Sequence, residues 1–381
     1  MTAEVTTMPP AAAPEAERGQ DPGRRRRRFK ELELAALLLL LIVFIWIVLW
    51  YLLFRQPINP LPPIPVSQIP TYSTSVYGAT RPIGVAVDPS GDRIYVTQGA
   101  AASEGIIFDG RGIAIGKFAV PAELGGSHQP AYAAVDPVSQ ELYVSDRLAG
   151  SIYIFDRDGR YLRELSLSTP RAGWQPMGLT FDAAGNLYVT DLAGPVIVEI
   201  DRAGSVVRTL GQGENLSFPN GVAIDKAGNV YVTDSNNGRL LMYGNDGQVL
   251  ARVGRGVGQG ALGLPRGLTI DSAGRVFIAD TTAQSVFIYG IPVIASPATT
   301  PAAGHLVLWY VGRLPLWGIS AQGAAAQQGP AVQAKFQFLG SFGEPGISDA
   351  QFQFLNGVAV DGRGRVYVAD TFNDRIQIWS Y

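Results

Sequence analysis

Short apolar runs alternate with turn-forming residues along most of the chain, and the alternation repeats. The clearest copy is DKAGNVYVTD at residues 225–234, with near copies at 182–191, 271–280 and 361–370. In each copy an Asp-x-x-Gly turn precedes a run of β-branched and aromatic residues, which favours a strand. After residue 55 no segment keeps a 3.6-residue period, so the repeats are not helical.

The first strand of each unit recurs about every 45 residues. Five units begin with proline and the last with leucine, at Pro82, Pro130, Pro176, Pro219, Pro265 and Leu355. Four strands of about five or six residues fill such a unit, and one sheet of that size cannot bury both faces alone. The pattern predicts an all-β fold, a six-bladed β-propeller whose sheets pack radially.

The ends of the repeat region predict how the ring closes. The chain finishes after the third strand of a unit, RIQIWSY, whereas residues 71–78 stand where a fourth strand would precede the first unit. We expect this N-terminal strand to complete the last blade and to remove its free edge.

A gap of 90 residues separates Pro265 from Leu355, twice the usual spacing. It indicates either a degenerate seventh blade or an insertion of about residues 291–334 between the third and fourth strands of blade five. We favour the insertion, because the segment lacks the Asp-x-x-Gly turn, although loops of this length are uncommon. Its apolar run includes Trp309, Tyr310 and Trp317, which either touch a membrane interface beside the stalk or fold back on blade five.

The N-terminal part has the pattern of a single-pass membrane anchor. Residues 34–54 are uncharged and apolar, and about 20 such residues span a bilayer. Arginines at 24–28 precede the run and only Arg55 follows closely, so the N-terminus is expected in the cytoplasm. The predicted order is a disordered cytoplasmic tail (1–31), a transmembrane helix (32–54), a proline-rich stalk (55–70) and an extracytoplasmic propeller (71–381). The alternative is a buried core helix.

Composition limits the available chemistry. The net charge of −2 gives no electrostatic case for nucleic acid. The absence of cysteine excludes disulfides, thiolate metal sites and a cysteine nucleophile. Two histidines, His128 and His305, cannot form a three-histidine zinc site and leave little for acid–base catalysis. We therefore assign no catalytic residue.

The repeat resembles the NHL repeat, most closely at PNGVAIDKAGNVYVTDSNNGRLLMY (219–243) and at 355–379. The resemblance covers about residues 71–381 and implies a six-bladed propeller. It implies little about activity, since the family includes enzymes, RNA binders, ligase substrate modules and bacterial sensor domains. Propellers similar to this one include amidating lyases, streptogramin lyases and calcium lactonases.

Two sets of residues are candidates for a site. The loops that lead into the first strands vary between units, which is typical of a binding surface. The candidates there are His128, Tyr132, Trp174, Met177, Asn220, Arg266 and Asn356. The carboxylates that end the second strands could bind Ca²⁺ on the axis: Asp146, Asp191, Asp234, Asp280 and Asp370. We favour a structural role for these aspartates, each capping the turn that follows it.

Two classes of function remain open. The first is a membrane-anchored extracytoplasmic module that binds or scaffolds a protein, peptide or glycan, contacts lipid through its N-terminal helix and needs no cofactor. The second is a propeller enzyme, a lyase or a hydrolase of lactonase type, with a carboxylate-bound metal such as Ca²⁺ on the axis. We favour the first, because the lyases that this propeller resembles depend on metals and histidines, and the chain has only two histidines.

Overall fold

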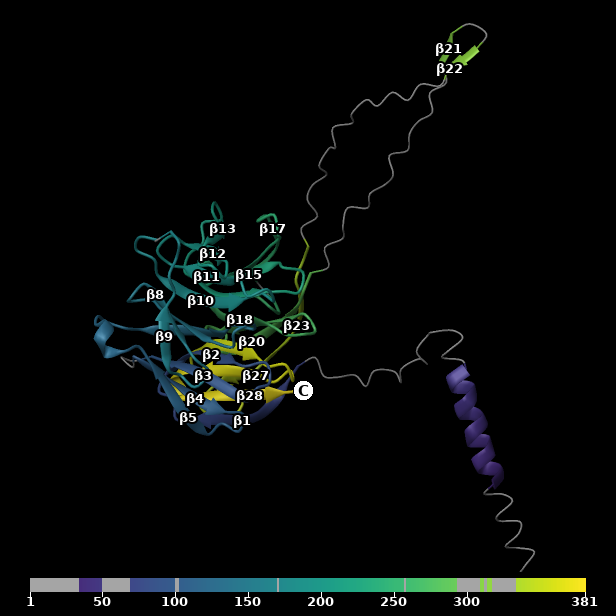
Figure 1. The fold of residues 1–381 in the computed structure, drawn as a ribbon, viewed down its shortest axis with the longest axis horizontal. Helices are drawn as coiled ribbons and strands as arrows, with labels where there is room; N and C mark the ends of the chain where they lie inside the picture. Colours follow the sequence, from purple (N-terminus) through teal and green to yellow (C-terminus); the bar gives the residue numbers. More distant parts are fainter. Residues whose placement is uncertain are drawn as a thin grey trace, which may run out of the picture. The chain divides into compact units, whose positions relative to one another are not determined.

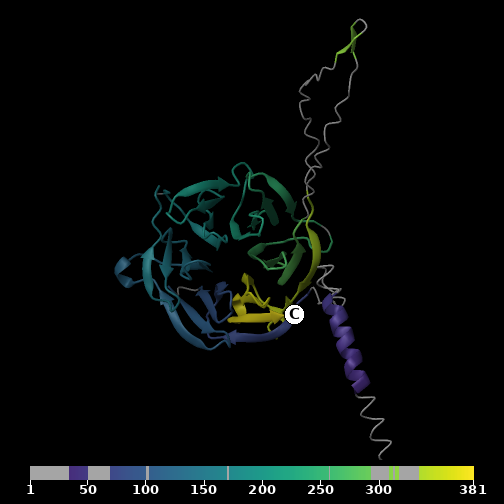
Figure 2. The ribbon, with the colours of Figure 1, turned by 45° about the vertical axis from the view of Figure 1, so that its right-hand side comes forward.

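The computed structural model describes residues 34–49, 69–99, 103–169, 171–256, 258–292, 309–311, 314–316 and 334–381. The chain divides into two compact units, Met1–Val66 and Ser67–Tyr381. Within the second unit, the described residues form six four-stranded antiparallel sheets arranged around a common centre (Figures 1 and 2). The predicted all-β, six-bladed propeller is confirmed.

Each sheet follows chain order, and its first strand contacts the first strands of the neighbouring sheets. The strands of blades one to three are β2 (Pro82–Val87), β3 (Arg93–Gln98), β4 (Glu104–Asp109), β5 (Ala114–Ala119), β6 (Pro130–Val135), β7 (Leu142–Asp146), β8 (Ser151–Phe155), β9 (Tyr161–Glu164), β10 (Pro176–Phe181), β11 (Leu187–Asp191), β12 (Val196–Ile200) and β13 (Val206–Leu210). Those of blades four to six are β14 (Pro219–Ile224), β15 (Val230–Asp234), β16 (Arg239–Tyr243), β17 (Val249–Val253), β18 (Pro265–Ile270), β19 (Arg275–Asp280), β20 (Ser285–Gly290), β23 (Gln337–Phe342), β26 (Leu355–Val360), β27 (Val366–Asp370), β28 (Arg375–Ser380) and β1 (Thr71–Tyr77). Short additional elements are η1 (Ala122–Leu124), η2 (Thr371–Asn373), β21 (Trp309–Val311), β22 (Leu314–Leu316), β24 (Glu344–Pro345) and β25 (Gln351–Phe352).

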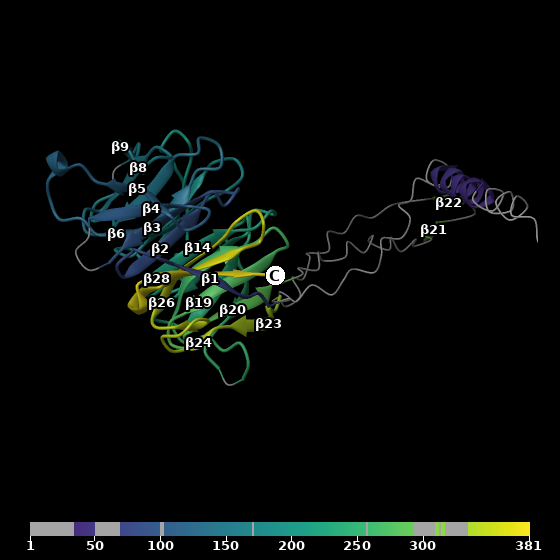
Figure 3. The same ribbon diagram turned by 90° about the horizontal axis from the view of Figure 1, so that it is seen from below.

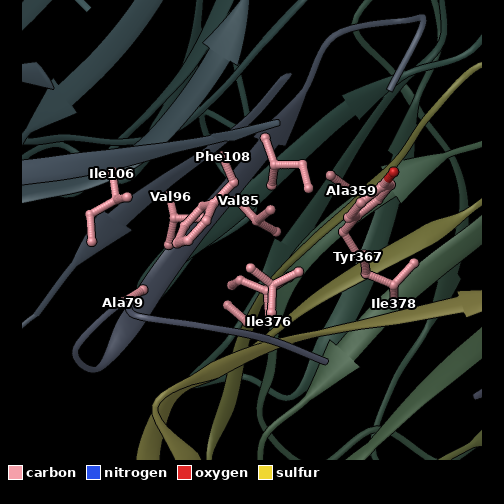
Figure 4. Close-up of a cluster of buried hydrophobic side chains, with 12 residues drawn as sticks. Ala79, Val85, Val96, Ile106, Phe108, Ala359, Tyr367, Ile376 and Ile378 are labelled. Atoms are coloured by element: carbon pink, nitrogen blue, oxygen red, sulfur yellow. The ribbon is translucent and has the colours of Figure 1, made fainter. Parts of the chain in front are cut away.

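The N-terminal strand closes the ring as predicted. β1 pairs antiparallel with β28, from Thr71 opposite Ser380 to Tyr77 opposite Arg375, and the two strands lie side by side in Figure 3. Val76 of β1 is buried in a cluster that also contains Ile376 and Ile378 of β28 and Phe108 of blade one. Figure 4 shows how side chains from blades one and six meet in this cluster. Closure is therefore a hydrophobic contact as well as a row of backbone hydrogen bonds.

The long spacing before Leu355 contains no seventh four-stranded sheet in the described residues. β20 pairs directly with β23, so the intervening residues connect the third and fourth strands of blade five. Within this connection β21 pairs antiparallel with β22, and near its end Ala334 forms an isolated bridge with Ala251 of β17. Trp309 and Tyr310 belong to β21, whereas Trp317 and His305 lie outside the described residues. Whether the apolar run meets a membrane or packs on blade five stays a prediction.

The alternating strand directions give the ring two faces. The loops leading into the first strands and the turns after the second strands share one face, which we call the pocket face. The turns between strands one and two, and between strands three and four, share the opposite face. The connection leaves β20 on that opposite face, and the chain also enters β1 there, since Thr71 pairs with the end of β28.

A ring of hydroxyl groups fastens each blade to the next near the axis. In blades one to four the penultimate residue of the second strand donates to a carbonyl of the next first strand: Thr97 to Ala131, Ser145 to Met177, Thr190 to Asn220 and Thr233 to Arg266. Blades five and six have Ala279 and Ala369 at that position. There the residue after the strand substitutes, with Thr281 donating to Leu355 and Thr371 to Pro82.

Removing one of these hydroxyls should loosen a blade contact without changing its shape. Thr190 is fully buried, and its Oγ1 lies 3.0 Å from the Asn220 carbonyl oxygen. We expect Thr190→Val to lower the free energy of unfolding by about 1–3 kcal/mol, because a buried carbonyl loses its donor. Urea unfolding followed by tryptophan fluorescence measures this. The matched change Thr282→Val, at an exposed position, should be neutral within about 0.5 kcal/mol.

The predicted transmembrane helix at 32–54 is not supported by the structure. The helix described in the N-terminal unit covers residues 34–49. No helix in the described part of the chain has both the length and the apolar content for a membrane span. Residues 50–54, the tail 1–31 and most of the stalk 55–70 lie outside the described residues.

Candidate functional site

An axial pocket opens on the pocket face, and every blade contributes to it. Its volume is about 330 Å³. The six blades supply, in chain order, Ile83, Ala131, Met177, Phe218, Arg266 and Asn356. The remaining lining residues are Arg81, Gly99, Gln129, Pro130, Arg147, Phe354, Thr371 and Phe372. Because all six blades converge on it, this pocket lies on the axis of the ring, where the first strands meet.

Three positions of the repeat supply most of the lining residues, and Pro130 and Phe372 add to them. The three positions are the residue before the first strand, the second residue of that strand and the residue after the second strand. In most blades the second residue of the first strand is followed by a glycine. This glycine lets the first strands of neighbouring blades approach closely. At Gly221, for example, a Cβ atom would lie only 2.6 Å from the Arg266 carbonyl oxygen. The tight backbone contact keeps the lining positions of adjacent blades next to one another.

A continuous stack of planar side chains forms one wall of the pocket. Phe354 and Phe372 are stacked, with ring centroids 4.6 Å apart and an interplanar angle of 12°. The Arg81 guanidinium lies 5.3 Å from the Phe372 ring centroid, and the Arg266 guanidinium lies 5.0 Å from that of Phe354. Each contact is a cation–π interaction, so the two phenyl rings position a positive charge at both ends of the stack.

The pocket is positively charged. Arg81, Arg147 and Arg266 line it, and no aspartate or glutamate is among the lining residues. Arg147 donates from Nη2 to the Gln129 side-chain oxygen at 2.7 Å, a neutral partner. Among the described residues, the buried Nε of Arg266 has no hydrogen-bond partner. None of these three guanidinium groups forms an ion pair among the described residues, and the nearby Asp374 carboxylate instead accepts the backbone amide of Arg81 at 2.7 Å.

Several residues lining the pocket have strained backbones. Arg81, Phe218 and Phe354 have φ values of 45°, 58° and 60°, in the left-handed region. Each directly precedes a first strand, and two of them precede proline, which further disfavours such a conformation. Non-glycine residues in this region cost about 1–3 kcal/mol each and concentrate at binding and catalytic sites. The fold therefore holds these three residues at the pocket in a backbone conformation that non-glycine residues disfavour.

Tyr132 does not occupy the position predicted from the sequence. Pro130 pairs with Asp146 as Pro82 pairs with Gln98, so Ala131 corresponds to Ile83 and Tyr132 to Gly84. Tyr132 thus replaces the close-contact glycine in blade two. Its phenol is buried without a hydrogen-bond partner among the described residues. Burial raises the pKa of Tyr132, and the Arg266 guanidinium from the blade across the ring partly opposes this rise.

Removing the Tyr132 hydroxyl should not destabilise the propeller. A buried hydroxyl without a partner has lost its water and gained no bond in return. We expect Tyr132→Phe to leave the melting temperature unchanged or to raise it. By contrast, Tyr132→Ala should cost about 3–5 kcal/mol through the cavity it leaves. A clear loss of stability in Tyr132→Phe would show that the hydroxyl has a partner, such as a buried water.

The other predicted binding residues fall into three groups. Met177, Arg266 and Asn356 line the axial pocket. Asn220 is fully buried, and neither polar atom of its side chain has a hydrogen-bond partner among the described residues. His128 and Trp174 instead line two neighbouring hollows, of about 620 and 370 Å³. Both ring nitrogens of His128 already contact acceptors, Asp146 Oδ2 and the Gly125 carbonyl oxygen, each at 3.0 Å.

Several lining residues were missed by the sequence analysis. Arg81, Phe218 and Phe354 directly precede the first strands, whereas most of the candidates that the prediction placed on those loops lie inside the strands. Arg147 and Phe372 lie just after the second strands, in turns that the prediction treated only as aspartate-capped. The signal was present, because charged and aromatic residues vary at both positions from one unit to the next.

The aspartates that end the second strands cap loops and turns in their own blades. Asp146 Oδ1 accepts the backbone amides of Gln129, Leu148 and Ala149, at 3.0, 3.1 and 3.0 Å. Asp280 accepts hydrogen bonds from four backbone amides in the same way. Two come from the loop before β18 and two from the turn after β19. Asp191, Asp234 and Asp370 each also accept a hydrogen bond from an arginine side chain. These carboxylates are therefore directed into their own blades, and the described residues contain no group of three acidic or histidine side chains arranged for a metal.

Comparison with known proteins agrees with the fold. Residues 216–243 match the NHL repeat family. A streptogramin B lyase structure superposes with a TM-score of 0.51 at 16% sequence identity, covering 81% of this chain and 97% of that one. Virginiamycin B lyase from Staphylococcus aureus gives a TM-score of 0.51 at 14% identity, covering 81% and 98%. At these identities the likeness concerns the propeller fold alone. No curated protein matches the chain.

Proposed function

We propose that this protein is a membrane-anchored, extracytoplasmic binding module that receives its ligand in the axial pocket. The observation that carries this proposal is the pocket itself, to which all six blades contribute a lining residue. Its three unpaired arginines and its aromatic wall are features of recognition, because they are costly or unnecessary for folding. A protein, a peptide or a glycan can present a group small enough to enter it.

The membrane attachment rests on the sequence. The apolar run 34–54 follows five consecutive arginines, which retain the N-terminus in the cytoplasm. The chain enters β1 on the face opposite the pocket.

The alternative of a propeller enzyme gains no support from the predicted site residues. His128 has both ring nitrogens engaged, and the second-strand aspartates are saturated by donors from their own blades. None of these groups reaches the axial pocket as a candidate acid, base or nucleophile.

Site-specific photo-crosslinking of the full chain in its own cells tests the proposal. A photoreactive phenylalanine analogue replaces Phe372 at the rim of the pocket in one protein. In the matched control it replaces Arg160, which is exposed in the β8–β9 turn of the opposite face. We expect a discrete adduct from position 372 and none from position 160, with its mass identifying the ligand. Adducts that form only at position 160 would refute the assignment of the binding face.

A further inference from the structure

We infer that the axial pocket recognises an oxyanion, a carboxylate or phosphate group on a small ligand or at the end of a larger one, and that the lining arginines Arg81, Arg147 and Arg266 supply the positive charge and the N–H donors that attract it. This inference rests on the proposed function, since it specifies the chemistry of the ligand that the pocket receives. It is supported by three independent features of the described residues: the pairing of arginines, the support of their side chains and the size of the pocket.

Arginine pairing across the propeller singles out this pocket. Fourteen of the eighteen arginines that the structure describes form an ion pair with an aspartate or glutamate. The four without one are Arg81, Arg147, Arg255 and Arg266. Three of these four line the axial pocket. In the described part of the chain, guanidinium groups are thus paired with carboxylates at most positions outside this pocket.

The guanidinium groups at the pocket are also held in place. Arg81 and Arg266 lie over the faces of the stacked Phe372 and Phe354 rings. Arg147 is oriented by its hydrogen bond to Gln129. Stacking leaves the edge of a guanidinium free, and its fork of N–H donors matches the two oxygens of a carboxylate or phosphate. Because these side chains are already ordered, an oxyanion would bind with little further loss of conformational entropy.

The pocket dimensions favour a small anionic group next to an apolar one. A volume of about 330 Å³ is at the lower end for small-molecule sites and too small for a folded segment. Phe218, Phe354 and Met177 supply apolar surface beside the arginines. An aromatic or aliphatic acid, or a phosphate ester of similar size, satisfies both parts of the lining.

Calorimetry on the full chain in detergent tests this inference with three probes. Benzoate and phenyl phosphate carry the two oxyanions on a phenyl ring, and benzamide is the neutral counterpart of benzoate. We expect at least one anion to bind more than about tenfold more tightly than benzamide, because hydrogen bonds from a guanidinium to a charged oxyanion are stronger than those to a neutral amide. Comparing the two anions identifies which oxyanion the pocket prefers.

Matched variants locate the binding. The substitutions Arg266→Gln and Arg147→Gln should each lower the affinity for the anion by about tenfold or more. Arg255→Gln removes the fourth unpaired arginine, which is exposed and outside the pocket lining, and should leave the affinity unchanged. Circular dichroism checks that each variant is folded. Equal binding of benzamide and benzoate, or no binding of either anion, would overturn the inference. The proposed function would survive that result if the crosslink at position 372 still forms.

Discussion

Deleting Thr71–Tyr77 from the full chain should abolish cooperative folding of the propeller. The deletion removes the whole β1 partner of β28 and turns β28 into an exposed edge. It also removes Val76 from the cluster that joins blades six and one, exposing Ile376 and Ile378. A loss of several kcal/mol is a large share of the roughly 5–15 kcal/mol that stabilises a typical domain. Thermal unfolding followed by circular dichroism at the β-sheet minimum should show a broad or absent transition.

Two point substitutions in β1 separate closure from a general effect of altering the N-terminus. Val76 is 4% exposed, whereas Thr74 on the same strand is exposed. Val76→Asp places a carboxylate in the apolar cluster and should cost more than about 3 kcal/mol. Thr74→Asp should cost less than about 0.5 kcal/mol. Equal stability of the two variants would mean that β1 does not seal the ring.

The sequence predicted the features of the fold that each repeat encodes locally. The 45-residue spacing predicted six blades once the 90-residue gap was assigned to an insertion. The extra strand at 71–78 and the missing fourth strand of the last unit predicted closure by β1. The sequence also shows where the hydroxyl that links neighbouring blades changes position. Blades with alanine before the aspartate of the second strand have threonine after it, as at Ala369 and Thr371.

The site was only partly predictable, because it forms between repeats. Arg81 and Arg266 come from blades one and five, and only the closed ring brings them to the ends of one aromatic stack. Tyr132 was named one residue too far along, because the alignment of Pro130 with Pro82 already makes Ala131 the equivalent of Ile83. The pairing of Pro130 with Asp146 agrees with that alignment. Contacts across the axis depend on blade order and loop length together, and the local pattern does not contain them.

Asp370→Ala should be the most destabilising single substitution among the second-strand carboxylates. Asp370 is fully buried and accepts the Gln353 amide at 2.7 Å, Asn373 Nδ2 at 2.8 Å, Arg375 Nε at 2.8 Å and Gln377 Nε2 at 2.9 Å. Arg375 is itself only 3% exposed. Removing the carboxylate leaves a buried positive charge without its main partner, which costs about 3–5 kcal/mol.

The same arginine supplies the control for this prediction. Asp349 Oδ1 lies 3.6 Å from Arg375 Nη1, but the Asp349 side chain is 65% exposed. An exposed ion pair contributes only about 0–1 kcal/mol, because water and salt screen it. Urea unfolding should therefore show a large shift of the midpoint for Asp370→Ala and almost none for Asp349→Ala. If the two variants unfolded at the same urea concentration, the aspartate at the end of the second strand would not be the structural anchor of its blade. The assignment of these carboxylates to capping rather than to an axial site would then lose its main energetic argument.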